Sequence, residues 1–324
     1  MPASRDISPS RRAWVTLLTK ASYLPGVVIL NYTLRKHRSI YPLVVLVTES
    51  LPQECVEALQ AEDRCDGKLD VHHIEPLIPR QEVRTVAERF DDTWTKLRVF
   101  DLVEYDKVVF LDADIMVMGE MDSLFDIELP GTDWLGATHA CCCNLDNDPW
   151  APADWKPPNC PFSTQTHPSA LRPSPASEPG APSTYHLMNS GVFGFHPSPQ
   201  LRDQIRNYFH TTPLLPQFTF PDQDFLNEFF RDRWINVGWQ WNATKTKMYW
   251  HRNIWRDEEV RALHYIVDKP WQKRVGPNGV AGYKGRDGIT HRWWWDMYDM
   301  WELDQKARGE NVNLGTVRDL VAEP

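Results

Sequence analysis

The chain has 324 residues, of which 42% are apolar and 12% aromatic, enough for the core of one large α/β domain or two ordinary domains. Its formal net charge of −9 excludes a general nucleic-acid surface, because phosphate binding needs a positive field and no run of lysine or arginine supplies one. The apolar runs are too short for a membrane span, and the N-terminus lacks a cleavage-like small-residue pattern, so we expect a cytoplasmic protein.

From residue 13 onward, short apolar runs alternate with helical patterns. Strands are predicted at 15–18, 43–48, 71–74 and 108–112, and helices between them at 25–34, 52–59 and 94–103. This order predicts a parallel sheet flanked by helices, whose ligands collect at the carboxyl ends of the strands.

Residues 144–183 are crowded with proline and poor in aliphatic side chains, which predicts a long surface loop beside the site. The sequence MNSGVFGF at 188–195 then predicts a further strand.

The six cysteines include the adjacent Cys141, Cys142 and Cys143, and reduced thiols are expected. A metal site at this tract is disfavoured, since adjacent side chains on a strand diverge and no C-x-x-C pair accompanies them; a buried strand is predicted instead. Asn31 and Asn242 begin N-x-S/T triplets, which a cytosolic chain leaves unmodified.

The predicted strand 108–112 ends in two carboxylates, Asp112 and Asp114. Carboxylates about 4 Å apart repel by roughly 4 kcal/mol at an effective dielectric constant near 20, so such a pair usually has a compensating cation. Mg²⁺ or Mn²⁺ would accept these oxygens and keep coordination positions for phosphate. The alternative is that Asp114 caps a turn and Asp112 binds nearby amides, which an isolated D-x-D would favour.

The context of this pair resembles a known family. LDAD followed by D-x-L-F (Asp122, Leu124, Phe125) is similar to the D-x-D region of glycosyltransferase family eight, the family of glycogenin and galactinol synthase. Five more segments resemble family blocks in the same order: TLLTKASY (16–23), TKLRVFDLVEYDKVVFLDAD (95–114), MNSGVFGF (188–195), PDQDFLNEFF (221–230) and HYIVDKPW (264–271). The resemblance, over about residues 13–272, implies a single GT-A-type, Rossmann-like α/β domain that binds a nucleotide sugar. Its mostly parallel central sheet would lie within residues 13–301, with the insert at 144–183 and tails at 1–12 and 302–324.

The resemblance also implies a metal and phosphate site. Asp112, Asp114 and His264 would ligate Mn²⁺, with Mg²⁺ as the alternative, and the ion would bind both phosphates of a UDP-sugar donor. Two carboxylates and a neutral imidazole suit such a divalent ion on chemical grounds as well. Ala113 would line the same site, and Lys269 would hold the diphosphate and stabilise charge on departing UDP.

Residues for the nucleoside and the sugar follow from the same resemblance. Tyr23 would stack on uracil, and Leu17 and Thr19 would line the base pocket, although Leu17 also suits the core. Lys96 would reach the sugar or phosphate, and an exposed helix lysine is the competing interpretation. Around the donor sugar, Asn189 and Ser190 would donate hydrogen bonds, Asp222 would orient hydroxyls, and the Gln223 carbonyl would stabilise the electron-poor anomeric carbon.

The implied activity is retaining transfer of a hexosyl group from UDP-glucose, UDP-galactose or UDP-N-acetylglucosamine to a polyol, glycan or protein hydroxyl. The sequence is compatible with a homodimer, and most of its 15 tryptophans, including Trp293, Trp294 and Trp295, are expected to serve packing. Two alternatives stay open: a non-catalytic nucleotide-sugar-binding protein, and a haloacid-dehalogenase-type phosphohydrolase.

Overall fold

The computed structural model describes residues 11–63, 68–79 and 93–323. Within these residues the main sheet has the strand order β3-β2-β1-β4-β8-β6-β9-β7. Strands β1, β2, β3 and β4 are mutually parallel, whereas β8 runs antiparallel to both β4 and β6. The bounds of these strands are β1 (Arg12–Leu18), β2 (Leu43–Val47), β3 (Leu69–His73), β4 (Lys107–Leu111), β6 (Leu135–His139), β7 (Ser174–Pro175), β8 (Met188–Phe195) and β9 (Trp234–Asn236).

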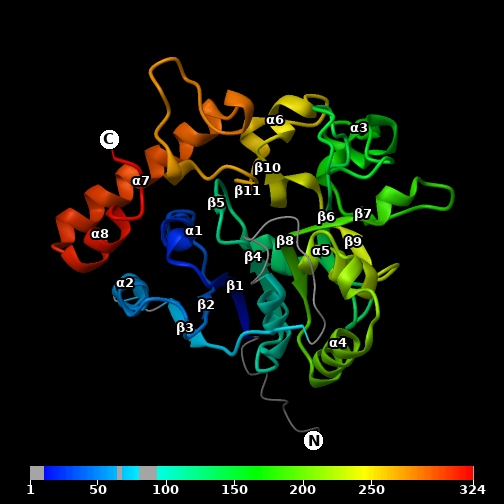
Figure 1. Cartoon of the computed structure of the whole chain (residues 1–324), viewed down its shortest axis with the longest axis horizontal. Helices are drawn as coiled ribbons and strands as arrows, with labels where there is room; N and C mark the ends of the chain where they lie inside the picture. The colour runs from blue at the N-terminus through cyan, green and yellow to red at the C-terminus, as the bar shows by residue number, and fades with distance from the viewer. Residues whose placement is uncertain (1–10, 64–67, 80–92, 324) are drawn as a thin grey trace, which may run out of the picture.

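Helices cover both faces of this sheet, which is why its central strands read as continuous apolar runs. Along β1, Trp14 packs into one core and its neighbour Val15 into the other, as alternation along a strand requires. The first core contains α1 (Leu24–Lys36), α2 (Gln53–Asp63), α7 (Gly288–Arg308) and α8 (Asn311–Arg318). The second contains the 3₁₀ helix η3 (Thr93–Asp101), α4 (Pro199–Thr211) and α5 (Pro221–Phe229). Figure 1 shows α7 and α8 beside α2 at one end of the molecule.

A second, small sheet has the order β10-β11-β5 in the described part of the chain. It consists of β5 (Ile115–Val117), β10 (Ala243–Thr244) and β11 (Ala262–His264), and α6 (Lys247–Trp250) follows β10. Because β5 follows β4 after three residues, this sheet brings β11 to the carboxyl end of β4.

The strands predicted at 15–18, 43–48, 71–74, 108–112 and 188–195 are present as β1, β2, β3, β4 and β8. The helix predicted at 94–103 is the 3₁₀ helix η3, and the spacing of three between Trp94, Leu97 and Phe100 is the repeat of that helix. The buried strand predicted for 141–143 is wrong: β6 ends at His139, and the tract that follows is irregular.

The proline-rich insert and the C-terminal segment also differ from a simple loop and tail. Residues 144–183 contain α3 (Pro161–Thr164) and several 3₁₀ turns, and the side chain of Phe162 is fully buried. The boundary expected at residue 301 falls inside α7, and α8 packs against α2. The tail expected at 1–12 lies almost wholly outside the described residues. In the tract 293–295, Trp294 and Trp295 are buried in the first core, as expected.

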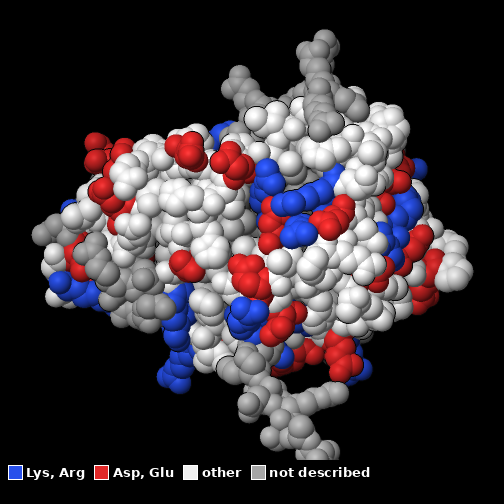
Figure 2. Space-filling model, turned by 90° about the horizontal axis from the view of Figure 1, so that it is seen from below, with Lys and Arg blue, Asp and Glu red and all other residues white. Residues whose placement is uncertain are grey.

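On the face shown in Figure 2, acidic and basic side chains of the described residues are interspersed and form no continuous basic band. This agrees with the absence of basic runs in the sequence. None of the described helices combines the length and the apolar character that a bilayer crossing requires.

Candidate functional site

The two carboxylates lie where β4 ends against β8. The backbone N–H of Asp112 donates to the carbonyl of Gly191 at 2.8 Å, which extends the antiparallel pairing by one residue beyond Leu111. The chain then turns at Ala113 and enters β5 at Ile115. The side chain of Asp112 is 25% exposed and that of Asp114 only 9%, so both carboxylates are largely shielded from solvent.

The pairing of β5 with β11 places His264 beside the two carboxylates. His264 is the register partner of Ile115, and the next residue, Tyr265, donates its backbone N–H to the carbonyl of Asp114 at 2.9 Å. Nε2 of His264 therefore lies 3.2 Å from Oδ1 of Asp114 and 3.7 Å from Oδ2 of Asp112. One ligand atom from each of the three residues lies within 4.8 Å of the others.

A hydrogen-bond network fixes which imidazole nitrogen faces the carboxylates. Nδ2 of Asn242 donates to Oδ1 of Asn189 at 2.7 Å, and the same oxygen accepts the backbone N–H of Gly191. With its amide oriented in this way, Asn242 presents its carbonyl oxygen to Nδ1 of His264 at 2.8 Å. Nδ1 must then carry the proton, and a neutral imidazole directs the lone pair of Nε2 towards Asp112 and Asp114. Three electron-rich groups converging in this way fit a divalent cation.

Two lysines offset part of this negative charge. Nζ of Lys96 lies 2.8 Å from Asp112 and 2.5 Å from Asp222, and Lys269 forms an ion pair with Asp114. Burial alone would lower the pKa of Lys96, but the two aspartates raise that pKa above its usual value. The side chain of Lys96 is only 8% exposed, so the interpretation as an exposed helix lysine is wrong.

The two carboxylates of the pair have opposite pKa shifts. Burial raises the pKa of Asp112, and although Lys96 opposes this, the neighbouring charge of Asp114 adds to it. Burial also favours the protonated form of Asp114, but the ammonium of Lys269 outweighs burial and holds the pKa of Asp114 below its usual range. Such divergence is expected when two carboxylates share one site.

The residues predicted to contact a sugar form one hydrogen-bonded group. Asp222 and Gln223 lie in the first turn of α5, facing the start of β8. Oγ of Ser190 donates to Asp222 at 2.8 Å, and Nδ2 of Asn189 donates to the carbonyl of Gln223 at 3.2 Å. Because Lys96 bridges Asp222 and Asp112, the structure joins this group to the candidate metal site.

The residues predicted to contact a base lie after β1. Leu17 and Thr19 are half-buried at its carboxyl end, and Leu17 also packs against the second core. The ring of Tyr23 lies 5.6 Å from Nζ of Lys269 and packs edge-on against Trp271. Ala113 lies beside α1, where a Cβ on Gly26 would collide with the Ala113 carbonyl oxygen.

The structure gives Asp122 and Asn242 roles that their sequence motifs do not indicate. Asp122, in the D-x-L-F segment, accepts Oγ–H of Ser39 at 2.6 Å and the backbone N–H of Ile40 at 2.9 Å, so it braces the loop before β2. Asn242 attracted notice only as the start of an N-x-S/T triplet, yet its side chain is completely buried against His264. A ligating histidine usually needs a partner for its second nitrogen, but nothing in the sequence indicates which residue supplies it.

Comparisons with known proteins identify the family and the relatives of this chain. The family model described as Glycosyl transferase family 8 matches residues 14–274. Galactinol synthase 1 of Solanum lycopersicum is 31% identical over 96% of this chain and 89% of its own length. Galactinol synthase 4 of Arabidopsis thaliana is 30% identical over 98% of this chain and 91% of its own.

Solved structures with a similar fold are more distant in sequence. The glycosyltransferase GlyE of Streptococcus pneumoniae TIGR4 aligns with a TM-score of 0.57 and 21% identity, over 88% of this chain and 60% of its own. The galactosyltransferase LgtC aligns with a TM-score of 0.54 and 17% identity, over 87% and 94%. These neighbours confirm the predicted GT-A-type α/β fold.

Proposed function

Because the chain belongs to glycosyl transferase family 8, we propose that it is a retaining glycosyltransferase that moves a hexosyl group from a UDP-sugar to a hydroxyl acceptor with a bound Mn²⁺ ion. The observation that carries this proposal is the convergence of Asp112, Asp114 and the unprotonated Nε2 of His264 at the carboxyl end of β4. These three side chains would hold the ion. When bound, the ion would neutralise charge on the diphosphate of the donor.

Lys269 would act on the leaving group. Its ammonium lies between Asp114 and the ring of Tyr23, and it also donates to the carbonyl of Tyr265 at 2.9 Å. From this position it would bind the diphosphate and stabilise the charge that develops as the bond to the sugar breaks. Tyr23, with Leu17 and Thr19, would hold the uracil on the other side of the diphosphate.

The group around Asp222 would hold the hexose. Lys96 and Ser190 both contact Oδ2 of Asp222, which leaves Oδ1 of this carboxylate to accept from sugar hydroxyls. The Gln223 carbonyl accepts from Asn189 and, at 3.4 Å, from the backbone N–H of Ser190. Its role at the anomeric carbon therefore requires that the donor sugar replace one of these contacts.

Retention of configuration would follow from departure and attack on the same face of the sugar. In this scheme a phosphate oxygen of departing UDP accepts the proton of the acceptor hydroxyl, so no protein nucleophile is needed. The names of the curated relatives favour UDP-galactose as the donor and a small polyol as the acceptor over the other pairs.

The test measures UDP release from UDP-glucose, UDP-galactose and UDP-N-acetylglucosamine with Mn²⁺ and a panel of polyols, and identifies the product by mass. We expect release with UDP-galactose that depends on both the ion and a polyol. Asp114→Asn should lower turnover by more than about 100-fold, because it removes the negative charge of a metal ligand. Asp126→Asn, at an exposed carboxylate paired with Arg12, is the matched control and should retain activity.

Other outcomes of this test would favour a different function or contradict the proposed site. Tight UDP binding without release from any donor would favour a binding protein, and mass added to the chain itself would indicate a protein acceptor. Full activity of a folded Asp114→Asn protein would contradict the proposed site.

A further inference from the structure

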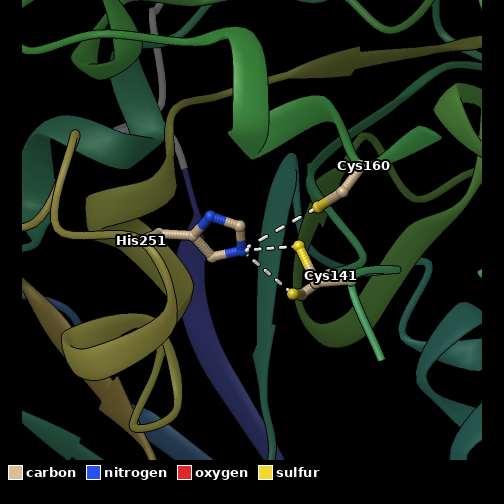
Figure 3. A group of neighbouring side chains, drawn as sticks. Cys141, Cys160 and His251 are labelled. Atoms are coloured by element: carbon tan, nitrogen blue, oxygen red, sulfur yellow. Dashed lines mark hydrogen bonds between the residues drawn. The ribbon is translucent and has the colours of Figure 1, made fainter. Parts of the chain in front are cut away.

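A second cluster of metal-ligating side chains lies outside the candidate active site. Nε2 of His251 lies 3.1 Å from Sγ of Cys141, 3.4 Å from Sγ of Cys143 and 3.8 Å from Sγ of Cys160. The four ligand atoms all lie within 4.8 Å of one another. Figure 3 shows the sulfur atoms of Cys141 and Cys160 directed at the same ring nitrogen of His251.

The alternation of side chains along residues 141–143 explains why only two of these three cysteines belong to the cluster. Cys141 and Cys143 point to one side, whereas Sγ of the intervening Cys142 contacts the carbonyl of Ala140 at 3.7 Å and is not in the cluster. The expectation that disfavoured a metal site at this tract is therefore not supported. Because adjacent side chains diverge, three consecutive cysteines cannot ligate one ion, but two cysteines separated by one residue can. The remaining ligands come from distant parts of the chain, which the spacing of cysteines alone does not reveal.

The distances match a tetrahedral zinc centre. Bond lengths of about 2.3 Å for Zn–S and about 2.0–2.1 Å for Zn–N place the nitrogen about 3.5 Å from each sulfur in a tetrahedron. The observed distances, 3.1, 3.4 and 3.8 Å, bracket this value. His251, Cys143 and Cys160 are buried and no disulfide joins the described cysteines, as a closed structural site requires. We propose that Cys141, Cys143, Cys160 and His251 bind one structural Zn²⁺ ion.

The charge of a neighbouring lysine supports this assignment. Lys247 is completely buried one turn before His251, and its ammonium contacts the carbonyl of Asn242 at 3.1 Å and Oγ1 of Thr244 at 3.2 Å. It also lies 4.6 Å from the centre of the Phe162 ring, so none of these contacts carries a negative charge. A buried cation needs a compensating charge nearby. Three thiolates and one Zn²⁺ carry a net charge of −1, which would offset the ammonium.

The zinc site would join three segments that are far apart in sequence. Cys141 and Cys143 follow β6, Cys160 lies within the proline-rich insert, and His251 follows α6. The insert has few aliphatic side chains of its own, so a metal would fix it where apolar packing is limited. Through Lys247 and Asn242, the same centre would also be connected to His264, so its loss would loosen the candidate active site.

The test is the zinc content of the purified full-length chain, expressed with zinc in the medium and dialysed against a chelator to strip the more exposed site. We expect about one zinc ion per chain, falling to less than about a tenth in Cys160→Ser and in His251→Gln. Cys142→Ser makes the same chemical change in the same tract without removing a ligand and should retain zinc. Asp114→Asn should also retain zinc, which separates this ion from the one proposed for catalysis.

A measurement on the unaltered chain covers the case in which the variants fail to fold. A mercurial reagent should release zinc to a chromogenic chelator in step with modification of three thiols. Co²⁺ in place of zinc should give thiolate charge-transfer absorption and the visible bands of a tetrahedral ion. A chain with reduced thiols that contains no zinc and takes up no Co²⁺ would overturn the proposal, as would undiminished zinc in Cys160→Ser or a disulfide within the cluster.

Discussion

The side-chain carbonyl of Asn242 lies 2.8 Å from Nδ1 of His264, and this contact sets which imidazole nitrogen faces Asp112 and Asp114. Asn242→Ala should therefore weaken Mn²⁺ binding in the presence of UDP by about 10- to 100-fold, the usual effect of losing the partner of a metal-ligating histidine. The loss can be measured from the electron paramagnetic resonance signal of free Mn²⁺ and from the metal dependence of UDP release.

Two variants control for this result. Asn242→Asp keeps an acceptor for Nδ1 of His264 and should bind the ion more tightly than Asn242→Ala. Asn31→Ala removes a buried asparagine from the other N-x-S/T triplet, and its Oδ1 has no hydrogen-bond partner in the structure, so Mn²⁺ binding should not change. Unaltered affinity in Asn242→Ala would show that the tautomer of His264 does not depend on this contact.

Because Gly191 has no side chain, the imidazole of His264 can occupy the space beside it. A Cβ at this position would lie 2.6 Å from Nδ1 of His264 and closer still to Cε1. Gly191→Ala should displace the imidazole and lower metal-dependent turnover by at least about tenfold, with a smaller effect on thermal unfolding.

Gly194→Ala is the matched control on the same strand. Its added Cβ would meet Cγ2 of Val109 at 3.3 Å, a milder contact than the one at Gly191 and with a residue outside the site, so activity should be largely retained. Equal losses in both variants would indicate that β8 as a whole, and not the position of His264, is disturbed.

The local pattern of the sequence predicts the central fold well. Strands β1, β2 and β4 are buried on both faces, so they appear as unbroken runs such as Leu43–Val47, and β8 corresponds to MNSGVFGF without a shift. The D-x-D pair also lies at the predicted strand end. These features depend on neighbouring residues, which periodicity and strand order report directly.

Features that depend on contacts between distant segments could not be predicted in this way. His264 reaches Asp114 through the pairing of β5 with β11, and each of these strands has only three residues, too few to give a periodic signal. The family resemblance supplied His264, but not Asn242. The sulfur cluster illustrates the same limit, since Cys160 and His251 are separated by 91 residues.

A buried ion pair positions the loop that carries Lys269. Lys245 and Asp287 are both fully buried, with 2.7 Å between Nζ and Oδ2, and Nζ also donates to the carbonyl of Asp268 at 2.8 Å. Asp287→Ala would leave the ammonium without its partner and should lower the free energy of unfolding by about 3–5 kcal/mol. Urea denaturation measures this change.

The double variant Lys245→Met with Asp287→Asn separates charge from packing. It removes both charges and keeps similar volumes, so it should be more stable than Asp287→Ala alone. If its loss is as large as the sum of the losses in the single variants Lys245→Met and Asp287→Asn, the stability comes from shape and not from the ion pair.

Glu62 makes stability depend on pH. This residue of α2 is buried beneath α7 and α8, where its Oε1 accepts from Trp301, Gln305 and Asn313. Burial raises the pKa of Glu62 to about 7, although the donated hydrogen bonds oppose the shift. Between the unfolded value near 4.5 and the folded value, the native state binds more protons than the unfolded state.

Stability from this group is therefore fully present below about pH 4.5 and is lost as the pH rises through about 7. The shift corresponds to about 3 kcal/mol. Glu62→Gln keeps an acceptor for the three donors and cannot ionise, so it should raise the unfolding temperature at pH 8 much more than at pH 5. Glu57→Gln, on the exposed side of α2, should change neither value. If Glu62→Gln and the unaltered chain lose stability in parallel from pH 5 to 8, ionisation of Glu62 is not the cause, and another buried acid must bind the proton.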